Sequence, residues 1–225
     1  KVDEIIEECY SDLEQLKRFL LETESFTPGS DDKLRKLIRL LKSNDLKGQK
    51  VIIFTEFSDT AKYLQAQLRE KGFERLAMVS GGTGDKVSAL RRFAPYYNAS
   101  SSSEAEASGG EIQILIATDV LSEGLNLQDA TKLINYDIHW NPVRLMQRIG
   151  RVDRRMNEDV EAKLLGDHPE LEEFRGKVTF WNFLPPDDLN AILSLYHKVT
   201  GKVLTISQTL GIEYGKLLRP DDDFR

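Results

Sequence analysis

At residues 51–55 the chain reads Val-Ile-Ile-Phe-Thr, a short apolar run rich in β-branched residues. Such a run is typical of a strand that a parallel sheet buries on both faces. The same signal predicts four further strands, at about 75–79, 112–117, 132–137 and 177–183. Helical spacing separates these strands. Strands that alternate with helices indicate an α/β fold with a mostly parallel, doubly wound sheet between helices.

Caps and apolar spacing mark the helices between the strands. Three are predicted: one capped by Ser58 or Asp59 and ended by Gly72, one that contains Val87, Leu90 and Phe93, and one from Pro142 to Met156. Before the sheet, a helix over 2–21 and a linker over 23–30 lead to a helix capped by Asp31 or Asp32. After it, residues 187–210 have helical spacing and the tail is expected to fray. The polar, serine-rich stretch 98–110 is expected to be a disordered surface loop.

Composition narrows the class of protein. The 225 residues carry a net charge of −6 and are 40% hydrophobic, which describes a globular chain with an acidic balance. No apolar run is long enough for a membrane span, and the charged N-terminus shows no signal peptide. A lone cysteine, Cys9, and three histidines speak against a structural zinc site, so no metal ligands are predicted. A reducing cytoplasm is the expected location.

A glycine-rich turn, Ser80–Gly84, joins a predicted strand to a helix, where phosphate-binding loops occur. It does not fit the phosphate-loop pattern G-x-x-x-x-G-K-[ST], because Asp85, Lys86 and Val87 follow Gly84. The turn is therefore either a tight connection or a backbone contact to an anion. The chain by itself contains no standard cradle for a triphosphate.

Arginines crowd the predicted helix 142–156. One stripe is apolar and is expected to be buried: Leu145, Ile149, Val152 and Met156. The neighbouring face carries Arg144, Arg148, Arg151 and Arg155, with Arg154 beside them. A solvated face is one interpretation, but such a face is usually mixed in sign and rich in lysine. This one is all arginine, which favours planar phosphate recognition. Gly150 inside a helix also suggests that something packs close to it.

The segment 117–127 leaves a strand at the edge where open α/β sheets bind ligands. Thr118, Asp119, Glu123 and Asn126 are therefore candidate site residues. The alternative is that Asp119 and Ser122 only cap local turns and that Asp119 and Glu123 face solvent.

Together these segments resemble superfamily 2 helicases. The run Gln147-Arg-Ile-Gly-Arg-Val-Asp-Arg154 is similar to the sixth motif, Q-x-x-G-R-x-x-R, and residues 51–55 and 117–127 resemble the fourth and fifth. Trp140-Asn-Pro142 is typical of the Swi/Snf-like branch. The spelling of the sixth motif is similar to that of bacterial ATPases that recycle RNA polymerase.

The resemblance implies a division of the chain. Residues 1–30 would form an N-terminal helix and linker, 31–185 the second RecA-like lobe of the motor, and 186–225 a helical C-terminal extension. The first lobe, which this chain lacks, would hold the phosphate loop and the ligands of Mg²⁺ for bound ATP.

The resemblance also implies roles for single residues. Arg151 and Arg154 would be arginine fingers at the γ-phosphate, with Gln147 beside the attacking water. The nucleotide contacts would come from Gly124, Asn126 and Arg148. Asn126 replaces an acid that often contacts the ribose, and Lys86 replaces a frequent arginine. The nucleic-acid backbone would be contacted by Thr55, Gly81, Gly82, Lys86 and Thr118.

The function implied is the second lobe of an ATP-dependent translocase or helicase on nucleic acid, with double-stranded DNA as the expected substrate. The chain alone is expected to be inactive, monomeric and away from membranes, and to work with the first lobe and with a protein complex. Two alternatives stay open: a non-enzymatic lobe that docks on a partner such as RNA polymerase, and an RNA helicase with true unwinding.

Overall fold

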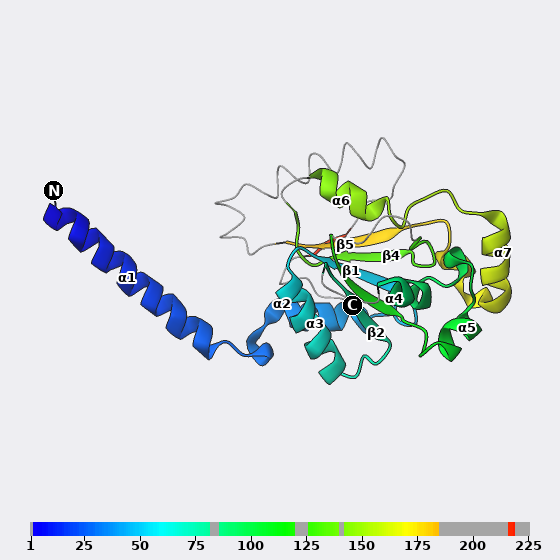
Figure 1. The fold of residues 1–225 in the computed structure, drawn as a ribbon, viewed down its shortest axis with the longest axis horizontal. Coiled ribbons are helices and arrows are strands. Elements are labelled where there is room, and N and C mark those ends of the chain that lie inside the picture. Colours follow the sequence, from blue (N-terminus) through cyan, green and yellow to red (C-terminus); the bar gives the residue numbers. More distant parts are fainter. Residues whose placement is uncertain (1, 82–85, 120–125, 140–141, 185–215, 219–225) are drawn as a thin grey trace.

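The computed structural model describes residues 2–81, 86–119, 126–139, 142–184 and 216–218. In this part of the chain six strands form one sheet in the order β2-β3-β1-β4-β5-β6, and every neighbouring pair is parallel (Figure 1). The strands are β1 (Val51–Thr55), β2 (Leu76–Val79), β3 (Ile114–Thr118), β4 (Lys132–Asn135), β5 (Thr179–Phe183) and β6 (Lys216–Leu218). The predicted RecA-like α/β fold is confirmed, and β6 is a strand that the sequence did not predict.

Helices other than the first cover both faces of the sheet. The long ones are α1 (Val2–Ser25), α2 (Asp32–Leu41), α3 (Ser58–Glu70), α4 (Lys86–Phe93), α6 (Pro142–Ile149) and α7 (Glu158–Asp167). The short ones are α5 (Ser102–Ala107) and the 3₁₀ turns η1 (Pro28–Ser30), η2 (Tyr96–Asn98) and η3 (Pro169–Phe174). None of the described helices is both long enough and apolar enough to cross a membrane.

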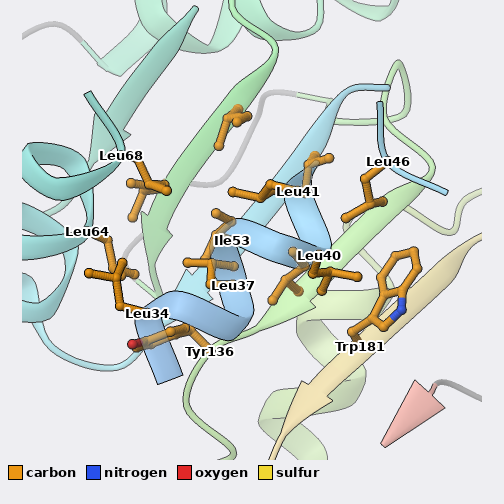
Figure 2. Packing of buried hydrophobic residues seen from close by; sticks show 14 of the residues in the cluster. Leu34, Leu37, Leu40, Leu41, Leu46, Ile53, Leu64, Leu68, Tyr136 and Trp181 are labelled. Carbon is orange, nitrogen blue, oxygen red and sulfur yellow. The ribbon is translucent and has the colours of Figure 1, made fainter. Parts of the chain in front are cut away.

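Alternation along the central strand divides the core in two. Val51 and Ile53 join the side chains of α2 and α3 on one face, a cluster shown in Figure 2. Ile52 and Phe54 join those of α4 and the end of α6 on the other. All five residues of β1 are buried, as expected for a strand covered on both faces.

The predicted caps are confirmed at α2 and wrong at α3. The Asp31 carboxylate caps α2 by accepting the Leu34 N–H at 2.9 Å. At α3, Ser58 is already the first helical residue, and neither Ser58 nor Asp59 caps the helix, because the cap position is Phe57. Gly72 follows α3 with a φ of +88°, which only glycine adopts readily, so the predicted end is confirmed.

The first helix extends away from the body of the domain (Figure 1). It is longer than predicted, since it includes the first residues assigned to the linker. Its large apolar side chains are between 47% and 71% exposed: Val2, Ile5, Ile6, Tyr10, Leu13, Leu16, Phe19, Leu20 and Leu21.

The serine-rich stretch 98–110 is ordered, so the disorder predicted there is wrong. Ser101 caps α5, and Ala105 of α5 is only 3% exposed. The Ser102 hydroxyl contacts His168 Nε2 at 2.9 Å and donates to Glu111 at 3.0 Å. A polar composition therefore does not mean disorder here, because hydroxyls and carboxylates provide caps and cross-links.

The helix predicted over 142–156 ends at Ile149, so its second half is wrong. The chain turns after Gly150, where the Val152 N–H donates to the Ile149 carbonyl at 2.9 Å. Gly150 is exposed at the end of the helix, and within the described part of the chain a Cβ at this position would meet only the Met146 and Gln147 carbonyls of the preceding turn. In α4, Leu90 and Phe93 are buried, whereas Val87 is 48% exposed. The segment 187–210, the tail, Gly82, Gly124 and Trp140 lie outside the described residues.

Candidate functional site at the carboxyl edge of the sheet

Two threonines end neighbouring strands at the carboxyl edge of the sheet. Thr55 closes β1 and Thr118 closes β3, and the two residues are paired in register. Both are buried, with exposed fractions of 0% and 3%. Among the described residues, the Thr118 hydroxyl has no hydrogen-bond partner. A buried hydroxyl without a partner is uncommon and costly, so this atom is suited to donate to a bound anion.

The Thr55 hydroxyl already has a hydrogen-bond partner within the domain. It donates to the carboxylate of Asp137, which follows β4, and the Lys33 ammonium lies 2.9 Å from the same carboxylate. Burial alone would raise the pKa of Asp137, but Lys33 and the donors from Thr55 and the Glu56 N–H outweigh it. The pKa of Asp137 therefore lies below its ordinary value, and the carboxylate stays ionised. The Thr55 hydroxyl is therefore not free to bind an external phosphate.

Arg148 is the largest departure from the predicted arginine face. Its guanidinium forms a bidentate pair with Asp119, Nε–Oδ1 at 2.6 Å and Nη2–Oδ2 at 2.9 Å. Nη1 donates to Asn135 Oδ1 at 3.3 Å and to the Asp137 carbonyl at 3.0 Å. The side chain is only 3% exposed and its guanidinium lies 5.5 Å from the centre of the Phe54 ring. Arg148 thus cross-links α6 to β3 and β4 from inside the domain, and it does not share an exposed face with its neighbours.

Asp119 is held ionised by the same pair. Burial would raise its pKa, but the Arg148 guanidinium and the more distant Arg144, at 3.5 Å, outweigh burial, so the pKa is lowered. The alternative in which Asp119 only faces solvent is therefore wrong: it is the carboxylate that satisfies Arg148.

The remaining arginines of the motif lie outside this pair. Arg151 and Arg154 are in the turn after α6 and are half-buried and exposed, respectively. Within the described part of the chain, no carboxylate pairs with either of them. Arg154 donates to the Gly150 carbonyl at 3.2 Å and to Asn126 Oδ1 at 3.3 Å. Gln147, on the last turn of α6, is exposed.

The other predicted residues occupy less buried positions. The Asn126 side chain donates to the Tyr97 carbonyl at 3.2 Å and accepts from Arg154. Lys86 begins α4 and its ammonium donates to the Gly81 carbonyl at 3.2 Å. Gly81 and Lys86 therefore meet, whereas Gly82 and Gly124 lie outside the described residues. Among the residues that are described, no group of three His, Cys, Asp or Glu side chains could hold a metal ion.

Sequence reasoning missed the Asp119–Arg148 pair, although a signal was present. Arg148 directly precedes Ile149 and follows Leu145 by three positions, so it lies at the border of the buried stripe. A charge at such a border is buried when a carboxylate comes within reach, and that depends on how the strand ends are arranged in space.

The parallel sheet, the helices on both faces and the polar carboxyl edge define a RecA-like α/β domain. Residues 32–156 match the model of the Helicase conserved C-terminal domain, which is more than half of the chain. The chain belongs to this family. A family of ATP-dependent helicases implies ATP use and nucleic-acid binding.

Several named proteins are similar to the chain. An uncharacterized ATP-dependent helicase, YqhH of Bacillus subtilis, is 33% identical over 77% of this chain and 26% of its own length. The RNA polymerase-associated protein RapA of Vibrio parahaemolyticus is 34% identical over 54% of this chain and 12% of its own length. The solved C-terminal domain of the DEAD-box protein Dbp5 is 19% identical, with a TM-score of 0.48 over 85% of each chain. The chain thus spans about a quarter or less of the length of YqhH and RapA. Further matches include proteins named as DNA helicases and as RNA helicases.

Proposed function

We propose that this chain is the second motor lobe of an ATP-driven translocase that moves along nucleic acid, with double-stranded DNA as its substrate. The observation that carries the proposal is the division among the arginines of the motif. Arg148 is neutralised inside the domain by Asp119, whereas Arg151 and Arg154 have no carboxylate among the described residues. Guanidinium groups left without an acid are suited to bind the planar face of a phosphate.

In this proposal Arg151 and Arg154 contact the γ-phosphate of ATP and neutralise the charge that develops in the transition state. Gln147 precedes them on α6 and orients the attacking water. Gly124 and Asn126 lie next to the nucleotide. Arg148 contributes by fixing α6 against the strand ends, because four of its N–H donors are already used within the domain. Mg²⁺ would neutralise the phosphates from ligands on the first lobe.

Nucleic acid is proposed to lie along the carboxyl edge. Thr118 would offer its buried hydroxyl beside Thr55 at the ends of the two strands, while Gly81 and Gly82 would offer N–H groups and Lys86 an ammonium. Short side chains and backbone N–H groups bind phosphate oxygens and carry no sequence information. Recognition would therefore be independent of sequence, as a translocase requires.

The proposal is tested in the longer protein that contains the preceding lobe. Arg151→Ala or Arg154→Ala should lower nucleic-acid-stimulated ATP turnover by about 10³-fold and leave DNA binding nearly unchanged. Lysine should not restore turnover, since a point charge cannot replace the planar fork. Arg155→Ala, a neighbouring exposed arginine outside the proposed site, is the matched control. Unchanged turnover in Arg154→Ala would refute the arginine-finger assignment.

The alternatives give different results in the same assays. A docking lobe would show no stimulated turnover and would bind its partner through the arginine-rich turn. An RNA helicase would be stimulated by RNA more than by duplex DNA and would separate strands. For a translocase, duplex DNA should stimulate turnover most, and the protein should act as one copy of the motor with its first lobe, within whatever protein complex recruits it.

A further inference from the structure

Asn98 lies outside the site just described, at the end of η2 and the start of the serine-rich stretch 98–110. Its side-chain amide forms hydrogen bonds with both the N–H and the carbonyl of Asn126. The Asn126 N–H donates to Asn98 Oδ1 at 3.2 Å, and Asn98 Nδ2 donates to the Asn126 carbonyl at 2.9 Å. Nδ2 also donates to the Ala94 carbonyl at 2.7 Å, just after α4. We call these three hydrogen bonds the Asn98 bridge.

The bridge leads directly to Arg154. The residue whose backbone it fixes, Asn126, turns its side-chain oxygen to Arg154 Nη1 at 3.3 Å and its side-chain nitrogen to the Tyr97 carbonyl at 3.2 Å. The position of Asn126 Oδ1, and with it the contact to the guanidinium, is therefore set by Tyr97 and Asn98. An amide is required for this arrangement, because it must donate to two carbonyls and accept one N–H at once.

The same part of the chain holds the rest of the arginine-rich turn. Gln128, only 4% exposed, donates to the Arg155 carbonyl at 3.1 Å. The Asn157 N–H donates to the Tyr97 hydroxyl at 3.2 Å. Three positions of the turn are thus held: Arg154 by Asn126, Arg155 by Gln128, and Asn157 by Tyr97 of η2. Tyr97, Asn98 and Gln128 lie outside the helicase motifs seen in the sequence, whereas Asn126 belongs to the fifth and Arg154 to the sixth.

We propose that Asn98 is a positioning residue that holds the turn of residues 150–157, and the Arg154 guanidinium within it, through Asn126. The part of this inference that concerns catalysis rests on the function proposed above for Arg154. The serine-rich stretch then acts as a support for the arginine-rich turn and not as a loose loop, since its first residue fixes the turn.

The positioning of the turn is tested on the 225-residue chain by hydrogen exchange. Asn98→Ala removes the bridge, and Asn98→Asp keeps the size but places a carboxylate against two carbonyls. Both should speed exchange of the amides of Asn126 and residues 151–157 by about tenfold, the effect expected when more than one hydrogen bond is lost. Tyr63→Phe is the matched control, because it removes a hydrogen bond to Asp31 on the opposite face of the sheet. Exchange in this turn that does not change in either Asn98 variant, or that rises equally in Tyr63→Phe, overturns the inference.

The catalytic consequence is tested in the longer protein by a double-mutant cycle. Asn98→Ala should lower kcat for ATP by about tenfold with KM nearly unchanged, and should have less than about a twofold effect once Arg154 is already alanine. Equal effects in both backgrounds would show a general structural role and overturn the link to Arg154. If Arg154→Ala itself leaves turnover intact, the proposed function fails, while faster exchange in Asn98→Ala would still support the positioning of the turn.

Discussion

Arg148→Ala should lower the unfolding free energy of the domain far more than Arg154→Ala does, although both residues belong to one motif. The Arg148 change removes a bidentate pair and two further hydrogen bonds, and it leaves the Asp119 carboxylate, which is 17% exposed, without its main partner. Removing one member of a buried ion pair costs about 3–5 kcal/mol of unfolding free energy. Arg154 is exposed and its two hydrogen bonds are 3.2–3.3 Å long, so its loss should cost about 0.5 kcal/mol or less.

Urea unfolding of the chain at pH 7, followed by circular dichroism, measures both variants against the parent protein. Replacing both partners at once, Asp119→Leu with Arg148→Met, should cost less than Arg148→Ala alone, because no charge is then left buried without its partner. That comparison separates the loss of the ion pair from the loss of packing on Phe54. If Arg148→Ala lowers the unfolding free energy as little as Arg154→Ala does, Arg148 is not a structural cross-link. A contact from Arg148 to the nucleotide, as the sequence predicted, would then be favoured.

Four further predictions follow from particular parts of the chain. Deleting residues 2–25 should leave the melting temperature within about 2 °C of the parent, since the apolar side chains of α1 are exposed; calorimetry checks this. Ala105→Asp should lower the unfolding free energy, measured in urea, by about 1–3 kcal/mol, because Ala105 is 3% exposed. An unchanged unfolding free energy would instead support the prediction that residues 98–110 are disordered. The lowered pKa of Asp137 means that its stabilisation is complete above its unfolded pKa of about 3.9 and is lost as pH falls through the folded value. Lys33→Met should therefore move the acid-unfolding midpoint to higher pH, measured by circular dichroism. The isolated chain should bind duplex DNA weakly, with a shallow log–log salt slope of about −0.9 per phosphate neutralised; tight, sequence-specific binding would contradict it.

Most of the sheet could be predicted from the sequence, because its strands are short apolar runs that carry their own signal. The run 51–55 is buried at every position and pairs with β3 and β4 in parallel register. The sixth strand, at residues 216–218, is too short for a periodicity to show, and only its pairing with β5 identifies it. The stretch 98–110 was misjudged because its order comes from polar contacts with distant residues such as His168.

The site was predictable in part for the same reason. Thr55 and Thr118 could be placed together from the rule that parallel strands end at one edge of the sheet, and the structure pairs them. The helix through Arg151 and Arg154 could not be limited to Ile149 by spacing, since the apolar stripe continues to Val152 beyond the helix end. Val152 is still buried, at 1% exposed, but it reaches the core from a turn.

The arginines show why a motif alone does not separate structure from chemistry. Arg148, Arg151 and Arg154 are spaced as one face would be, and nothing in their own spacing distinguishes them. What distinguishes them is the position of the carboxylates. Asp119 directly follows β3 and there pairs with Arg148 of α6, while Arg151 and Arg154 lie beyond the end of the helix and pair with no carboxylate of the described residues. A guanidinium that pairs with a carboxylate inside the domain stabilises the fold, and one that has no carboxylate partner remains able to bind a phosphate.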